Sequence, residues 1–173
     1  MSKCIICGGR DFDVTKMPYD EVKNLEQKLY KIFQEEEVDE EVCGMAVGAD
    51  MYGATFAKCF EYPVKEFPAY WDNLTPSDNE PVSIGVNKLG KKYNKIAGIN
   101  RNRRMAEYAA AHPNGIVIAL PGGSGTLNMI NVGFKHGLKV YKYNIETKQF
   151  DTFMPLKNKS KSKEVWKNEC IRG

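Results

Sequence analysis

Gly115-Ile-Val-Ile-Ala-Leu-Pro-Gly-Gly-Ser-Gly-Thr126 is the stretch of sequence that decides the fold. Its first half, residues 115–120, is a short apolar run rich in β-branched residues, which is typical of a buried strand in a parallel sheet. A proline and a glycine-rich turn follow without a spacer. Apolar residues then recur at helical spacing from Thr126 to His136, so the sequence predicts a strand, a tight turn and a helix.

A helix that begins directly after a glycine turn offers a binding site for an anion. The first N–H groups of a helix have no partner within it, and its positive dipole end faces the loop. Gly122, Gly123 and Gly125 allow the backbone to approach a ligand, while Ser124 and Thr126 add hydroxyl donors. We therefore interpret this turn as a phosphate-binding loop. The alternative is a strand–helix turn that needs glycine for its conformation alone.

The rest of the chain alternates the same two patterns. Strands are predicted at residues 3–7, 41–46, 63–67, 115–120 and 138–143, and helices at 19–37, from 49, from about 97 to 111 and at 126–136. This alternation predicts an α/β fold with a parallel sheet between two helical layers. Phe150 and Phe153 predict a small hairpin or strap on the core. Residues 69–96 are expected to form an irregular loop. The acidic run at 35–41 is expected to be a solvated helix end.

Length and charge restrict the class of protein. The 173 residues suit one domain at 1–154, followed by a basic tail at 155–173 with six basic and two acidic residues. The total charge of +3 therefore leaves the body near neutral, which argues against a nucleic-acid surface. No apolar run approaches the ~20 residues that span a bilayer. We expect a cytoplasmic protein with reduced cysteines, no metal site and no membrane partner.

The loop after the first strand, like the glycine turn, lies at the carboxyl edge of the predicted sheet, where open α/β folds bind ligands. Gly8 and Gly9 break the chain there. Arg10 is then placed to face a phosphate and Asp11 to accept a hydrogen bond from a ribose hydroxyl. The alternative is that both charges pair with neighbours and only shape the loop.

Two further candidates follow the second and third strands. Asp50 opens a helix, so it either caps that helix or points into the cleft, and the two roles are compatible. Tyr70 and Trp71 come just after the third strand, where they stack on a base, cover a sugar, or instead cap the core.

Three arginines at the start of one helix are a further sign of an anionic ligand. A surface helix prefers acidic residues in its first turn, but Arg101, Arg103 and Arg104 occur there instead, around Asn102. Helical spacing places Arg101 and Arg104 on one face and turns Arg103 away. We expect Arg101 and Arg104 to face the ligand.

Four motifs together resemble a known family. They are residues 7–12 (CGGRDF), residues 48–50 (GAD), Ala97-Gly98 with Arg101-Asn102, and residues 121–126 (PGGSGT). In combination they resemble the SLOG superfamily, which includes the lonely-guy phosphoribohydrolases and DprA-related proteins, and most closely its YspA-like branch, over residues 3–143. The resemblance implies a Rossmann-like three-layer sandwich with a mostly parallel sheet of five or more strands. It implies ligand contacts from Gly8, Gly9, Arg10, Asp50, Arg101, Asn102, Gly122, Gly123, Gly125 and Thr126.

One position departs from the family pattern. The phosphoribohydrolases have a catalytic glutamate two residues after the threonine of this loop, whereas this chain has Asn128. An amide is neither a general base nor a stabiliser of an oxocarbenium ion. We therefore expect a sensor or sequestering protein for a phosphorylated nucleoside, such as an ADP-ribose derivative or a cyclic nucleotide signal, without a cofactor.

Two other functions remain open at this stage. One is a nucleoside 5′-monophosphate N-glycosidase that uses Asp50 in place of the missing glutamate. The other, least favoured, is nucleic-acid binding through the basic tail. The resemblance also implies a homodimer or higher homo-oligomer, with the helix from Thr126 as its interface.

Overall fold

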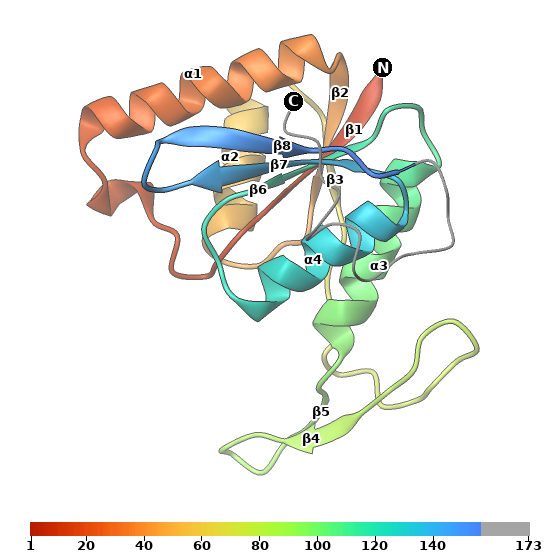
Figure 1. Ribbon diagram of the computed structural model, residues 1–173. Helices are drawn as coiled ribbons and strands as arrows, with labels where there is room; N and C mark the ends of the chain where they lie inside the picture. The colour runs from red at the N-terminus through yellow and green to blue at the C-terminus, as the bar shows by residue number, and fades with distance from the viewer. Residues whose placement is uncertain (157–173) are drawn as a thin grey trace.

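The computed structural model describes residues 1–156 and has an α/β fold (Figure 1). Its central sheet has six strands in the order β3-β2-β1-β6-β7-β8. Every neighbouring pair is parallel except β7 and β8, which are antiparallel. The strands are β1 (Ser2–Cys7), β2 (Val38–Cys43), β3 (Val64–Glu66), β6 (Ile116–Ala119), β7 (Lys139–Asn144) and β8 (Gln149–Phe153). The expected mostly parallel, Rossmann-like sandwich is confirmed.

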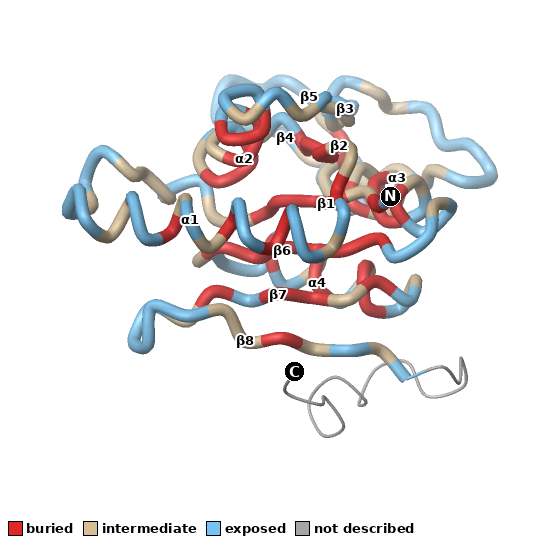
Figure 2. The backbone as a smooth tube through the Cα atoms, turned by 90° about the horizontal axis from the view of Figure 1, so that it is seen from above, coloured by how far each residue is buried: buried red, intermediate tan, exposed pale blue. Residues whose placement is uncertain are grey.

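Helices cover both faces of this sheet. They are α1 (Tyr19–Glu35), α2 (Ala49–Cys59), α3 (Ala97–Ala110) and α4 (Ser124–Lys135), with a short 3-10 turn at Val14–Lys16. Two buried clusters follow from the alternation of side chains along the strands. Cys4 and Ile6 of β1 pack with α1 and α2, whereas Ile5 and Cys7 pack with α3 and α4. Burial is concentrated along the central strands (Figure 2).

The chain of β1 shows why Cys4 and Cys7 do not act as a pair. They lie in the two different clusters on opposite faces of the sheet, as the strand pattern predicts. Cys4, Cys7 and Cys43 are buried free thiols, and burial raises the pKa of each. All three lie in the interior of the described part of the chain.

The predicted hairpin at the end of the body is confirmed as strand β8. It runs antiparallel to β7, with Tyr143 opposite Phe150 and Val140 opposite Phe153. The rings of Tyr143 and Phe150 lie 5.2 Å apart. These aromatic residues add an edge strand to the parallel sheet.

Two predictions around the acidic run are wrong. The second strand begins at Val38, not at residue 41, because acidic residues of the run belong to the strand itself. Glu41 is fully buried, and Glu36 accepts hydrogen bonds from Lys139 and Tyr141 rather than facing solvent. The charged residues of this segment obscured the strand in the sequence, because only its two valines are β-branched.

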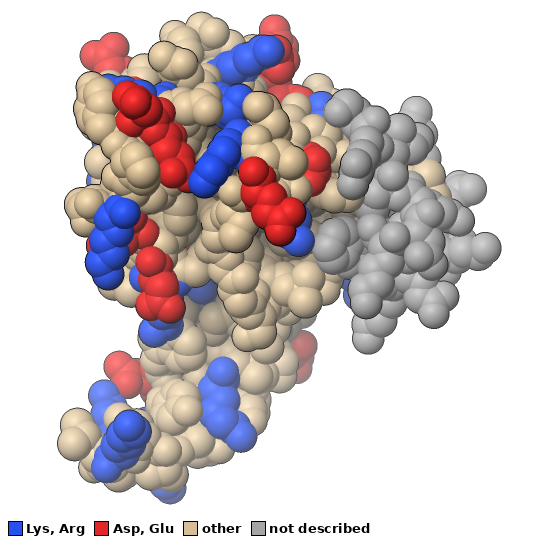
Figure 3. Space-filling model, turned by 60° about the vertical axis from the view of Figure 1, so that its left-hand side comes forward, with Lys and Arg blue, Asp and Glu red and all other residues tan. Residues whose placement is uncertain are grey.

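Residues 69–96 are more ordered than the sequence predicts. They contain a separate two-stranded antiparallel sheet, β4 (Ile84–Val86) and β5 (Lys92–Asn94). This hairpin projects from the body beyond the start of α3 (Figure 1) and forms a distinct lobe with basic side chains on its surface (Figure 3). Strands of three residues are too short for a periodic signal, which is why the pattern missed them.

The basic tail predicted at 155–173 falls almost entirely on residues 157–173, which lie outside the described part of the chain. Among the helices of residues 1–156, none combines the length and the apolar character needed to cross a membrane.

Candidate functional site

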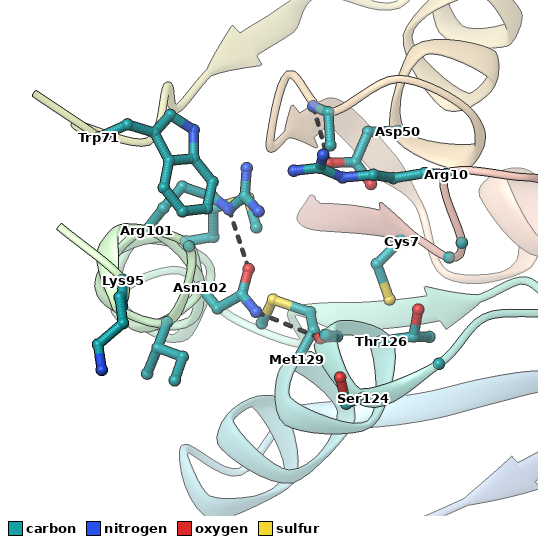
Figure 4. Close-up of a pocket in the computed structure, with 18 residues that line it drawn as sticks. Cys7, Arg10, Asp50, Trp71, Lys95, Arg101, Asn102, Ser124, Thr126 and Met129 are labelled. Atoms are coloured by element: carbon teal, nitrogen blue, oxygen red, sulfur yellow. Dashed lines mark hydrogen bonds between the residues drawn. The ribbon is translucent and has the colours of Figure 1, made fainter. Parts of the chain in front are cut away.

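A cavity of about 450 Å³ opens at the carboxyl ends of β1 and β6. Five chain segments form its walls: the loop after β1, the first turn of α2, the base of the projecting hairpin, and the first turns of α3 and α4 (Figure 4). Its lining residues are Cys7, Gly8, Gly9, Arg10, Ala46, Asp50, Trp71, Lys95, Gly98, Ile99, Arg101, Asn102, Met105, Gly123, Ser124, Gly125, Thr126 and Met129. Most of the expected site residues are thus brought together.

The loops after β1 and β6 pack directly against each other. The N–H of Gly9 donates to the carbonyl of Pro121 over 2.8 Å. A Cβ at Gly122 would lie 2.5 Å from the nitrogen of Gly9 and closer still to Oγ1 of Thr126. Gly122 is therefore required by the packing of the two loops, which is the alternative that the sequence left open for this turn. It lies beside the cavity rather than in its lining.

Gly123 and Gly125 are different, because packing does not require them. A Cβ built at either position would meet nothing within 4 Å, and both residues line the cavity. Gly123 is the N-cap of α4 and supplies no side-chain hydrogen bond. The N–H of Leu127 donates to the carbonyl of Gly123, so the N–H groups of residues 124–126 precede the helical ladder. Open space faces the positive end of a helix here.

Arg101 reaches into the cavity from the first turn of α3. Its Nε donates to Oδ1 of Asn102 over 3.0 Å, and its Nη1 donates to the carbonyl of Gly44. A Cβ at Gly44 would lie 2.5 Å from Oδ2 of Asp50 and 2.9 Å from Nη1 of Arg101, so both charged groups converge on this glycine. The guanidinium is fixed at the cavity wall and does not point into bulk water.

Asp50 lies in the first turn of α2 and is buried. Its Oδ2 accepts a hydrogen bond from the N–H of Ala46 over 3.3 Å. Burial raises the pKa of this carboxyl, and the charges of Arg101 and Arg10 oppose that rise. The side chain therefore holds the loop before α2 and faces the cavity, which combines the two roles expected for it.

Asn102 joins α3 to α4 through its side-chain amide. Its Nδ2 donates to Oδ1 of Asn128 over 2.9 Å and to the carbonyl of Gly125 over 3.4 Å. Asn128 stands where the phosphoribohydrolase pattern has glutamate, yet it is outside the cavity lining. In this chain Asn128 joins α4 to α3, while Asn102 is the residue that holds the glycine turn.

Four expected contacts are placed outside the cavity lining: Asp11, Tyr70, Arg104 and Gly122. The Nε of Arg104 lies 2.8 Å from Glu80, and its guanidinium carbon lies 4.3 Å from the ring centre of Tyr70. Contrary to the expectation from helical spacing, Arg104 does not accompany Arg101 into the cavity. It turns with Arg103 toward Glu80, because that carboxylate on the hairpin segment attracts both guanidinium groups.

Several lining residues carry no sequence signal of a binding site. Lys95 and Ile99 flank the start of α3, and Cys7 and Met129 close the floor of the cavity. Cys7 and Met129 carry only the pattern of core residues, so no signal separated them from the core. Lys95 directly follows strand β5 of the hairpin, which the sequence pattern did not predict, so its position in the cavity lining could not be predicted either.

No three His, Cys, Asp or Glu side chains are grouped as a metal site anywhere in residues 1–156. Comparisons of the chain with protein-family models, curated protein sequences and solved structures give no significant match. The fold and the cavity thus define the class: a Rossmann-like α/β protein with a cleft at the carboxyl edge of its sheet.

Proposed function

We propose that this protein binds a nucleotide or nucleotide-derived ligand, as a sensor or sequestering protein, with a phosphate at the N-terminus of α4. The observation that carries the proposal is the open space at Gly123 and Gly125. Neither glycine is needed for packing, yet both leave the first amides of α4 facing the cavity. An anion is the natural ligand of such amides.

The charges of the cavity support an anionic ligand. Arg10, Arg101 and Lys95 line it, against a single carboxyl group from Asp50. A phosphate on the α4 turn would lie opposite Arg101, and the carboxyl of Asp50 would accept from a ribose hydroxyl. Trp71 forms the wall on which a base would stack. The resemblance to the SLOG superfamily agrees with this arrangement and suggests ligands such as ADP-ribose derivatives or cyclic nucleotides.

Isothermal titration calorimetry with AMP, ADP-ribose and a cyclic dinucleotide tests the proposal. Gly123→Asp and Gly123→Asn form a matched pair, because both residues are good N-caps and fit the open space. They differ in charge, so the aspartate variant should lose far more affinity than the asparagine variant. Absence of binding by the wild type, or equal binding by the aspartate variant, would refute the proposal.

A second candidate function, nucleoside 5′-monophosphate N-glycosidase, is favoured by one observation. Asp50 is a buried carboxyl at the cavity with a raised pKa, which suits a general acid. In this reaction water adds to C1′ of the ribose, the N-glycosidic bond breaks, and the departing base takes up a proton. Activity that needs protonated Asp50 would fall as the pH rises through its pKa.

Chromatography for free base after incubation with nucleoside monophosphates decides between the two functions. An N-glycosidase would release base and ribose 5-phosphate, and Asp50→Asn would abolish the release while phosphate binding persisted. No release across the four common monophosphates would eliminate the enzymatic function and leave the binding function.

A further inference from the structure

A second, smaller cavity of about 290 Å³ adjoins the phosphate cleft. Arg10, Ala46 and Trp71 line both spaces and form the border between them. We call the smaller space the annex. It is lined by Arg10, Gly44, Met45, Ala46, Val47, Pro68, Ala69 and Trp71.

The annex differs from the main cleft in its chemistry. Its side chains are aliphatic or aromatic except for Arg10, whereas the main cleft holds three cations, a carboxyl and hydroxyl groups. Two backbone carbonyls of its walls are already engaged: Gly44 accepts from Arg101, and Pro68 accepts from Arg104. The annex therefore offers flat surfaces to a planar ring, since the Trp71 ring and the Arg10 guanidinium are both planar.

The loop at residues 44–48 is held firmly although it presents apolar side chains to solvent. Met45 has a φ of 63°, which is rare for a residue other than glycine, and its N–H donates to Sγ of Cys43 over 3.3 Å. Asp50 holds Ala46, and Gly48, with a φ of 86°, packs against the carbonyl of Gly9. Met45 and Val47 nonetheless remain 37% and 64% exposed.

An unusual backbone conformation that displays apolar side chains beside a ligand cleft is typical of a binding surface. Folding of the body does not account for it, because Met45 and Val47 belong to neither buried cluster of the core. A ligand whose phosphate lies at α4 and which extends past Trp71 would cover both residues.

We propose that the annex receives the heteroaromatic base of the ligand, stacked on Trp71 and packed against Met45 and Val47. This inference rests on the proposed nucleotide-binding function and adds the position of the base to it. The ligand then has two parts of different chemistry, an anionic sugar phosphate in the main cleft and a flat, weakly polar ring in the annex.

The same arrangement sets the specificity of the site. Among the described residues that line the annex, the only side-chain hydrogen-bond donors are the Arg10 guanidinium and the indole N–H of Trp71, and no carboxylate, amide or hydroxyl side chain is present to read the edge of a base. Stacking tolerates every base because each has a π-face. Purine and pyrimidine monophosphates should therefore bind with affinities within about tenfold of one another, whereas ribose 5-phosphate should bind more weakly than any of them.

The test compares AMP with ribose 5-phosphate by calorimetry on the wild type and two variants. Val47→Glu places a carboxylate in the annex. Val86→Glu is the matched control, because Val86 is also exposed, at 62%, but lies on the projecting hairpin away from both cavities. Thermal unfolding checks that both variants fold.

We expect Val47→Glu to weaken AMP binding by about tenfold, the effect of losing one stacked base, and to leave ribose 5-phosphate binding unchanged. Val86→Glu should match the wild type with both ligands. If Val47→Glu bound AMP normally while Gly123→Asp did not, the annex inference would be wrong and the phosphate site would stand. If the wild type bound neither ligand, the proposed function itself would fail.

Discussion

Glu41 is a buried acid that the proposed function does not use. It is fully buried in β2, and no charged or hydroxyl side chain among the described residues pairs with its carboxyl group. Burial, and then the charge of Asp50, raise its pKa from 4.5 to about 9. The unfolded chain releases this proton near pH 4.5 and the folded protein near pH 9, so the free energy of unfolding falls as the pH rises between them.

Glu41→Met should therefore stabilise the protein, because it replaces an unpaired acid by an apolar side chain of similar size. The difference in the free energy of unfolding between the variant and the wild type should increase as the pH rises from 4.5 to 9, by at most about 1.4 kcal/mol per pH unit. Urea unfolding at a series of pH values measures it, with Glu66→Met on exposed β3 as the control. A gain that is constant with pH would mean that Glu41 is charged in the folded protein at neutral pH.

Some residues of the cleft could be predicted from the sequence, whereas the orientation of others could not. Gly8, Arg10, Asp50 and Arg101 were expected at the cleft, because each follows or opens an element at the carboxyl edge of the sheet, and they line it. The direction of Arg104 could not be read from helical spacing. It depends on Glu80, which a hairpin absent from the pattern brings close.

At the scale of elements, the strongly patterned strands and helices were predictable, while the segment at 69–96 was not. This segment supplies Trp71 to both cavities and Lys95 to the main cleft. It is joined to α3 by Glu80, which pairs with Arg104, and by the carbonyl of Pro81, which accepts from Asn100 over 2.9 Å. An isolated two-stranded hairpin is marginally stable, so these contacts should govern its order.

Glu80→Gln should loosen this segment without unfolding the sheet. Amide hydrogen exchange at residues 70–96 should become about tenfold faster, which corresponds to about 1.4 kcal/mol of local stability. Glu107→Gln, which removes only an exposed pair with Arg103 on α3, is the matched control. Unchanged exchange in the segment, or equal acceleration throughout β1 and β6, would show that Glu80 is not its anchor.

At the scale of the whole molecule, the outer side of helix α4 bears on how the protein assembles. Helix α4 packs on the sheet with Met129 and Ile130 and leaves Leu127 45% exposed on its outer side. We propose that α4 is the interface of a homodimer. Sedimentation should show a dimer for the wild type and a monomer for Leu127→Glu, since a buried unpaired charge is costly. A monomeric wild type would contradict the proposal.

The proposed function depends most on the first amides of α4, and nuclear magnetic resonance observes them directly. Titration of ¹⁵N-labelled protein with AMP should shift the amide signals of Gly123, Ser124, Gly125 and Thr126, because the phosphate accepts hydrogen bonds from this turn. Adenosine, which lacks the phosphate, should leave these four signals in place. If AMP left them unmoved, or if adenosine moved them equally, the turn would not be an anion site and the proposed function would be wrong.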